Sequence, residues 1–270
     1  MQITSAMKMV SAAKLKKAQD AIVAMRPYSD TLTQLIQNLS DSLDGDGQNP
    51  YTQQREVKSV IIIAVTSNRG LCGAFNSNVI KQCRQLIQDQ YAGKQVKLVT
   101  IGKKATELLA KSASITSSHD SLFDDLNYQN TGEVAQHIMD QFSEGTVDEV
   151  VLVYNQFKNA ATQIVQTEAF LPIVPGASEE ARAAVDYIYE PNQTTIVNDL
   201  LPKSLKMQLY KALRDSFASE HGARMTAMHK ATDNATELRD QLKLTYNKAR
   251  QAAITNEILE IVGGAEALNN

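Results

Sequence analysis

The loop from Ser67 to Asn76 (SNRGLCGAFN) holds the residues of this chain that could most readily do chemistry. It lies between an apolar run and a helical pattern, which is where nucleotide-binding folds place their phosphate loop. The residue types argue against that role. The glycines are spaced G-x-x-G rather than G-x-G-x-x-G, and no Gly-Lys-Ser/Thr follows. We therefore interpret the loop as a structural turn whose glycines permit tight strand-to-helix packing.

Other residues that could support catalysis are present but isolated. Gly102-Lys103-Lys104 stands where a dinucleotide site would need a ribose-binding carboxylate. Cys72 and Cys83 match neither a metal spacing nor a Cys-x-x-Cys pair, and no His–acid pair is positioned to activate Cys72. The four histidines are scattered, without a second ligand at metal spacing. The sequence predicts no catalytic residue, no metal site and no cofactor.

The elements around this loop are unusual in length. Residues 203–262 contain no proline and a single glycine, Gly222. A continuous helix of that length would be about 90 Å long, whereas a compact chain of this size has a radius of gyration of only about 18 Å. The helix must therefore project as a rod. A rod needs a second helix or another protein to cover its apolar stripe.

The N-terminus supplies a second helical pattern, from Gln2 to Leu43, interrupted only by Pro27. Both patterns repeat with a mean step near 3.5, which indicates a left-handed two-helix supercoil. The predicted seam residues are Ile3, Met7, Val10, Leu15, Ala18, Ile22 and Met25, with Met225, Met228, Thr232, Ala235, Leu238, Leu242, Thr245, Ala249 and Ala252. Two helices at opposite ends of a chain pair antiparallel when the middle folds as a domain. Pro27 is expected to kink the first helix.

The middle of the chain alternates strand and helix patterns after a polar linker at 44–56. This alternation predicts an α/β fold, Rossmann-like, with a mostly parallel sheet covered on both faces. Predicted strands are 57–66, 96–101, 147–154, 164–171 and 185–189, and predicted helices are 76–91, 103–111 and 132–143. The predicted domains are 1–43 (coiled-coil helix), 44–202 (α/β domain) and 203–270 (coiled-coil helix).

Charge is spread unevenly over these domains. Net charge is −3 in total, with +2 on each terminal segment and −7 on residues 44–202. A nucleic-acid partner is disfavoured because the charges of the rod are mixed in sign and no aromatic residues are interleaved with them. Solvated helix faces, or a protein partner of acidic character, account better for the pattern. No window of the sequence is apolar enough to span a membrane.

Three separated segments closely resemble the gamma subunit of F-type ATP synthases. They are QITSAMKMVSAAKLKKAQ followed by RPY, the loop TSNRGLCGAFN, and ARMTAMHKATDNA with YNKARQAAITNEILEIVGGAEAL. The resemblance implies a non-catalytic rotor whose coiled coil turns inside a ring of alpha and beta subunits. It implies an α/β domain beside the epsilon subunit and the membrane c-subunit ring. It also implies a peripheral membrane protein on the cytoplasmic face of the bacterial inner membrane.

The resemblance also assigns contact residues. Arg250 and Gln251 match positions that hydrogen-bond to the catalytic subunit, and Met7 matches a shaft position near an acidic loop of that subunit. An apolar sleeve of the catalytic hexamer is implied around the helix tip. Polar loops of the membrane ring are implied to meet the corner of the α/β domain. The tip residues are Ile258, Leu259, Ile261 and Val262, and the corner residues are Tyr187 and Glu190.

Two departures from the family bear on these expectations. Family members usually carry about twenty more residues before the segment that matches Gln2. A shaft that starts at Met1 is expected to leave about 30 Å of the C-terminal helix without its partner. The cysteine-bearing insertion of the chloroplast form is missing, so no thiol control is expected.

Two other classes of function stand beside the rotor. One is a stand-alone Rossmann-like nucleotide-binding enzyme that uses the Ser67–Asn76 loop. The other is a coiled-coil scaffold protein or nucleic-acid tether. Purification separates them, because a rotor subunit co-purifies with an ATPase complex whereas an enzyme is active alone.

Overall fold

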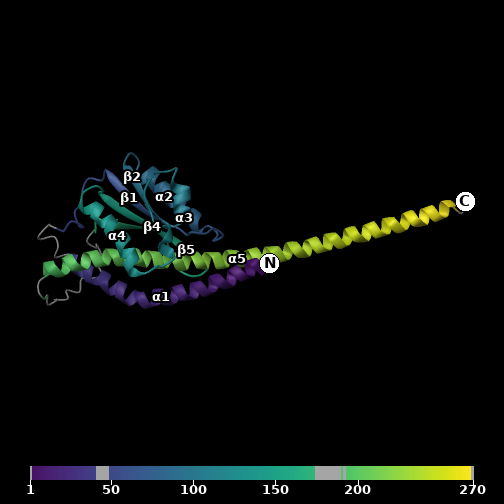
Figure 1. Cartoon of the computed structure of the whole chain (residues 1–270), viewed down its shortest axis with the longest axis horizontal. Coiled ribbons are helices and arrows are strands. Elements are labelled where there is room, and N and C mark those ends of the chain that lie inside the picture. Colours follow the sequence, from purple (N-terminus) through teal and green to yellow (C-terminus); the bar gives the residue numbers. More distant parts are fainter. Residues whose placement is uncertain (1, 41–48, 174–189, 191–192, 269–270) are drawn as a thin grey trace.

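The computed structural model describes residues 2–40, 49–173, 190 and 193–268. An α/β body lies against one part of a single long helix, and the rest of that helix projects away from it (Figure 1). This helix, α5 (Gln193–Leu268), has 76 residues and is therefore about 114 Å long. The other terminal helix is α1 (Gln2–Ser40). The predicted rod beside an α/β domain is confirmed.

The body is built on one five-stranded sheet in the order β3-β2-β1-β4-β5. Four strands are parallel, and the edge strand β5 runs antiparallel to β4. The central strand β1 is buried along its whole length because it has neighbours on both sides and helices on both faces. The strands are β1 Ser59–Val65, β2 Gln95–Ile101, β3 Ser114–Ser118, β4 Glu149–Phe157 and β5 Gln163–Leu171.

Alternate residues of β1 enter two different cores, as the two-residue period of a strand requires. On one face, Val60, Ile62 and Ala64 pack under α2 (Phe75–Gln85) and α3 (Lys103–Leu109). On the other face, Ile61, Ile63 and Val65 pack under α4 (Tyr128–Ser143) and the early part of α5. The mostly parallel sheet covered on both faces is thereby confirmed.

The long helix serves two structures at once. Leu205, Leu209 and Leu213 of α5 belong to the core of the sheet, while later residues of the same helix form the rod. The helix begins ten residues before the predicted Lys203 and carries Pro202 within it. Proline removes one backbone hydrogen bond, but Val197 and Leu201 just before it are buried against α1. Tertiary packing therefore continues the helix through Pro202, past the predicted domain boundary between 202 and 203.

The remaining predicted elements agree closely with the observed ones, with three differences. Strand β3 was missed because it is short, polar and at the sheet edge. The helix after β1 ends in a π-helical turn, Leu86–Gln90. The short 3₁₀ turn Asp120–Phe123 was also missed. The predicted strand at 185–189 lies outside the described residues.

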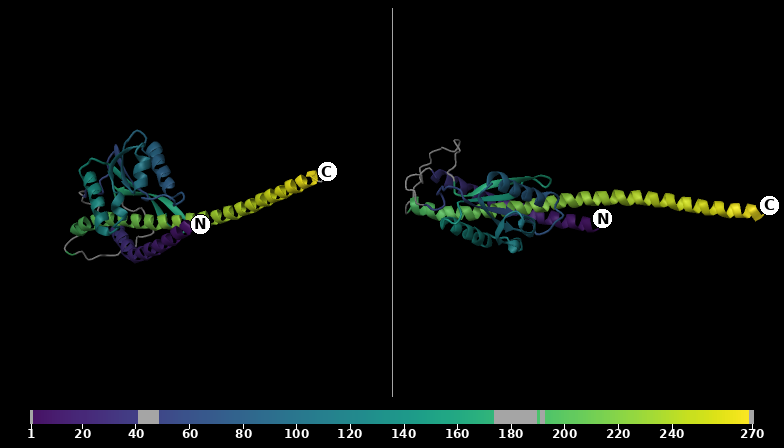
Figure 2. Two further views of the ribbon diagram at one scale, coloured as in Figure 1. Left: turned by 45° about the vertical axis from the view of Figure 1, so that its right-hand side comes forward. Right: turned by 90° about the horizontal axis from the view of Figure 1, so that it is seen from above.

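Helices α1 and α5 pair antiparallel, as predicted. Thr4 contacts Thr232, Ile22 packs near Ala218, and Leu32 packs near Val197. As the position along α1 rises, the position of its partner on α5 falls, and all views show the two helices side by side (Figures 1 and 2). Within the part of the chain that the structure describes, no helix is long and apolar enough to cross a membrane.

The seam differs by one residue from the prediction at its N-terminal end. Ile3 and Val10 are 77% and 58% exposed, whereas Ser11 is buried. The hydroxyl of Ser11 donates to the carbonyl oxygen of Met7 at 2.8 Å, which makes its burial tolerable. The buried positions then recur in steps of three, four or seven: Ser11, Leu15, Ala18, Ile22, Ser29 and Leu32. The prediction missed the serines because it followed apolar residues alone.

Candidate functional site

The distal part of α5 is a helix that no other described residue of the chain covers. Every residue from 237 to 265 is exposed, a stretch of about 44 Å. Large apolar side chains lie along it: Leu238, Leu242, Leu244, Tyr246, Ile254, Ile258, Leu259, Ile261 and Val262. Exposed apolar surface on this scale marks an interaction site. This stretch is the strongest candidate for a functional surface in the described part of the chain.

The predicted seam therefore needs correction in its second half. Leu238, Leu242 and Thr245 were expected to face α1, and so were Ala249 and Ala252. All are exposed, because α1 begins at the level of Thr232 and does not reach them. Their heptad spacing is real, but the described residues of this chain provide no partner helix for it. The stripe is available to another surface.

The predicted hexamer-contact residues divide between two levels of the rod. Arg250 and Gln251 are exposed on the uncovered stretch, as are the tip residues Ile258, Leu259, Ile261 and Val262. Met7 lies half-buried on α1, in the two-helix section. At 1.5 Å per residue, Arg250 lies about 27 Å beyond Thr232 along α5. The structure therefore does not bring Met7 and Arg250 together within the chain.

The predicted ring-contact residues are only partly described. Glu190 is exposed in a bend just before α5, which agrees with an accessible corner of the domain. Tyr187 lies outside the described residues.

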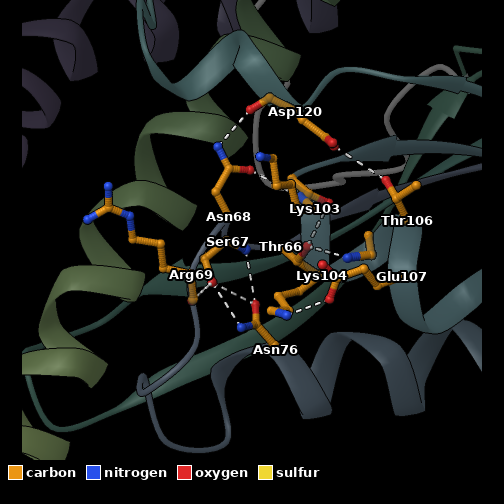
Figure 3. A network of polar contacts seen from close by, with 12 residues as sticks. Thr66, Ser67, Asn68, Arg69, Asn76, Lys103, Lys104, Thr106, Glu107 and Asp120 are labelled. Atoms are coloured by element: carbon orange, nitrogen blue, oxygen red, sulfur yellow. Dashed lines mark hydrogen bonds and ion pairs between the residues drawn. The ribbon is translucent and has the colours of Figure 1, made fainter.

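The loop after β1 is held by its own polar network (Figure 3). The Ser67 N–H donates to Oδ1 of Asn76 at 3.0 Å, and the Lys103 N–H donates to Oδ1 of Asn68 at 3.0 Å. The Ala105 N–H donates to Oγ1 of Thr66 at 2.8 Å. A phosphate loop would offer such amides to its ligand. Here side chains already bond three such amides, one at the start of the loop and two in the first turn of α3, which favours the predicted structural turn.

The crevice beside this loop is filled by the long helix. Ala223 of α5 packs against Cys72 and Phe75, at the carboxyl edge of the sheet where α/β proteins bind nucleotides. Burial raises the pKa of the Cys72 thiol, despite its contacts with Ser67 and the nearby Arg224 charge. A protonated thiol is a poor nucleophile, in agreement with the sequence interpretation of Cys72.

A buried charged cluster on α5 ties the helix to the same loop. Arg224 Nη1 pairs with Glu220 Oε1 at 2.5 Å, and Arg224 Nη2 donates to the carbonyl oxygens of Arg69 and Gly70 at 3.1 and 3.3 Å. Burial raises the pKa of Glu220, although the charge and the hydrogen bond of Arg224 act to lower it. Because a buried arginine needs acceptors for its fork of donors, these contacts fix the loop against the helix.

His221 adds a neutral ring to this cluster. Burial, together with the Arg224 and Lys14 charges, lowers the pKa of His221 to about 3. The neutral ring packs edge-on against Phe217, with centroids 4.5 Å apart. Sequence analysis missed the roles of Arg224 and His221. The only local signal was the lone Gly222 between them in a sixty-residue helix.

Fold and surface together define a shaft protein, with a Rossmann-like domain at one end and an uncovered helix at the other. A family model described as ATP synthase matches residues 1–268. The chain is 66% identical over 269 residues to the ATP synthase gamma chain of Flavobacterium johnsoniae, covering 100% of this chain and 94% of that one. It belongs to the family of ATP synthase gamma chains.

Two solved structures share the fold. The central stalk and c-ring structure of the Tetrahymena thermophila mitochondrial ATP synthase contains a chain that matches with a TM-score of 0.65 and 24% identity, covering 85% of this chain and 99% of that one. The Euglena gracilis mitochondrial ATP synthase, solved with its OSCP, F1 and c-ring, contains a chain that matches with a TM-score of 0.61 and 20% identity, covering 95% of each chain.

Proposed function

We propose that this protein is the central-stalk rotor of an F-type ATP synthase. It transmits torque between the proton-driven membrane ring and the catalytic alpha/beta hexamer, and it carries out no catalytic step itself. The observation that carries the proposal is the uncovered stretch 237–265 of α5, a single helix about 44 Å long. A rod of this length with so many exposed large apolar side chains is not expected to stay in water without a surrounding protein. Membership of the gamma-chain family supports the same conclusion.

The mechanism rests on asymmetry. A helix presents a different set of side chains at each angle around its axis, so three identical sites around it meet three different surfaces. Differential contact energy then biases each site toward a different conformation. As the rod turns, each site passes through the whole series. The protein's own residues therefore supply position and contact energy, while the chemistry belongs to its neighbours.

The tip suits a bearing, in this proposal. Ile258, Leu259, Ile261 and Val262 are all exposed, and Ile261 is 66% exposed. Apolar burial is non-directional, so an apolar tip in an apolar sleeve has no strongly preferred angle. The alpha and beta subunits would form this sleeve.

Arg250 and Gln251 are proposed to supply the directional contact that the tip lacks. Both are exposed on α5, and a guanidinium can bind a carboxylate of the catalytic subunit through two parallel hydrogen bonds. Met7 is proposed to lie near an acidic loop of that subunit, at the level of the two-helix section. The lysines that flank it on α1, Lys8, Lys14, Lys16 and Lys17, are compatible with an acidic neighbour.

The foot of the rotor is proposed to meet the membrane ring and the epsilon subunit through the α/β domain. Residues 44–202 carry a net charge of −7, and Glu190 is exposed on this domain. Tyr187 is proposed to contribute to the same surface. The protein would then be peripheral to the cytoplasmic face of a bacterial inner membrane, attached through its complex.

Reconstitution tests the proposal. Because Cys72 and Cys83 are buried, Lys81→Cys introduces an exposed thiol on the α/β domain for a gold nanorod. The labelled chain is combined with alpha and beta subunits, and ATP is added. Stepwise rotation of the nanorod is the expected result. A chain that hydrolyses a nucleotide by itself would instead indicate the stand-alone enzyme. A chain that binds neither subunit would indicate a scaffold.

A further inference from the structure

One turn of the long helix is in close contact with the tip of the β4–β5 hairpin. A Cβ atom added to Gly222 would lie 3.2 Å from both Cα and the carbonyl oxygen of Ala160. The hydroxyl of Thr226, one turn further on, donates to the same carbonyl oxygen at 3.1 Å. Glycine therefore permits the close approach, and threonine adds a directional bond at the point of approach.

The opposite side of the same turn is held by the loop after β1. The helix rotates by about 200° between Gly222 and Arg224, and by the same angle again between Arg224 and Thr226. Arg224 therefore points away from the hairpin, and it donates to the carbonyl oxygens of Arg69 and Gly70. We use the word collar for Ala160 on one side and Arg69–Gly70 on the other.

The third side of this turn is covered by α1, and the contacts there are of a different kind. Leu15, Ala18 and Ile22 pack against Ala218, with Met225 at the edge of the cluster. Apolar packing has little directional preference, whereas hydrogen bonds weaken steeply away from their preferred angle. Earlier in α5, Gln208 and Arg214 also donate to carbonyl oxygens of the α/β domain. Among the described residues, the polar contacts of the collar are therefore the last ones at which the domain fixes the angle of α5 about its own axis.

We propose that this collar is the joint that fixes the rotational angle of the rod to the α/β domain, with Gly222, Arg224 and Thr226 as its positioning residues on α5. The inference rests on the proposed rotor function. The last collar residue on α5, Thr226, lies about 17 Å before the uncovered stretch begins at 237. Torque applied to the domain reaches the tip through this joint.

The test measures torsional stiffness in the assembled complex. Lys81→Cys places an exposed thiol on α2 for a gold nanorod, since Cys72 and Cys83 are buried. With the catalytic subunits stalled, the rod tip is held, and the angular fluctuation of the nanorod reports the compliance between domain and tip.

Two mild variants each weaken one side of the collar. Thr226→Val removes the hydroxyl, and Arg224→Lys keeps the charge beside Glu220 but loses the two-pronged fork.

Angular variance scales inversely with stiffness, so loss of one of two comparable sides is expected to raise the collar's share of the variance by up to about twofold. The share of the uncovered helix between collar and tip stays unchanged. Thr226→Ser should restore the narrow distribution. Thr236→Val is the matched control, because the Thr236 hydroxyl donates to the carbonyl oxygen of Thr232 in its own helix and Thr236 lies before the uncovered stretch. A purely structural role would lower thermal stability without broadening the distribution. If the angular distributions of the variants are as narrow as that of the unmodified chain, the collar proposal is wrong. If the unmodified complex never rotates, the proposed rotor function itself is wrong.

Discussion

The hydroxyl of Thr232 donates a hydrogen bond of 2.8 Å to the hydroxyl oxygen of Thr4, 228 residues away in the sequence. This pair joins the start of α1 to the middle of α5. On one side of it the two helices cover each other, and from residue 237 to residue 265 α5 is exposed all round. The pair thus marks the level at which a two-helix shaft becomes a single helix. The bending stiffness of the rotor should change at the same level.

Asp215 gives a prediction for the pH dependence of stability. It is 5% exposed on α5, facing Lys211 of its own helix, Arg26 of α1 and Glu168 of β5. Burial raises its pKa from 3.8 to about 6, against the attraction of Lys211 and Arg26. The folded protein therefore keeps a proton that the unfolded chain loses as pH rises from 3.8 to 6. Folding stability falls over this window and stays lowered above it.

Asp215→Asn should remove this cost. At pH 7 the variant is expected to be more stable by up to about 3 kcal/mol, and the difference should shrink toward zero near pH 4. Urea unfolding, followed by near-ultraviolet circular dichroism of the buried tyrosines, measures it. Asp199→Asn, an exposed change on the same helix, should show no comparable gain. If the stability gain of Asp215→Asn over the unmodified protein grows as the pH falls, the predicted direction of the pH dependence is wrong.

Gly102 gives a prediction about the sheet domain. It has a φ of +98°, and an added Cβ would clash with the carbonyl oxygen of Thr66. Gly102→Ala is expected to lower the unfolding free energy by about 2–4 kcal/mol, from backbone strain and overlap together. Gly93→Ala is the control, since Gly93 also has a positive φ, +78°, but open space around it. If both variants lose the same unfolding free energy, the overlap of the added Cβ with the Thr66 carbonyl oxygen carries no cost of its own.

Arg250→Ala is expected to lower ATP synthesis by the assembled complex. A guanidinium–carboxylate contact is worth about 1.5–3 kcal/mol, enough to bias one rotor angle without locking it. The measurement is ATP synthesis in membrane vesicles that contain equal amounts of complex. Lys248→Ala removes a neighbouring charge of the same exposed helix and should have little effect. If ATP synthesis is unchanged in Arg250→Ala, the proposed contact of Arg250 with the catalytic subunit is wrong.

Glu190→Lys is expected to reduce proton pumping by the whole complex and to leave ATP hydrolysis by the isolated catalytic head unchanged. One exposed ion pair contributes only about 0–1 kcal/mol, so the loss should be partial. The ratio of pumping to hydrolysis measures it. Glu144→Lys, at the exposed end of α4, makes the same change of charge elsewhere on the domain. If both variants lower the ratio equally, the effect is one of general charge.

The sequence by itself determined the elements whose signals are local. The absence of proline and the single glycine in 203–262 required a rod, and the apolar run at 57–66 required a buried central strand. Each signal is read from neighbours in the chain, because helix propensity, strand alternation and turn residues act over a few positions. The residues proposed to contact other proteins came from resemblance, since single exposed residues carry no local signal.

The tertiary structure decided everything that depends on what packs opposite. Leu205 and Leu213 could equally have faced a coiled-coil partner, but they cover the sheet. Ser11 occupies the seam in place of Val10, because its hydroxyl finds an acceptor in its own helix. The collar joins residues more than 60 positions apart, and no local pattern encodes such a pairing. Long-range contacts depend on how whole elements dock, which only the folded chain specifies.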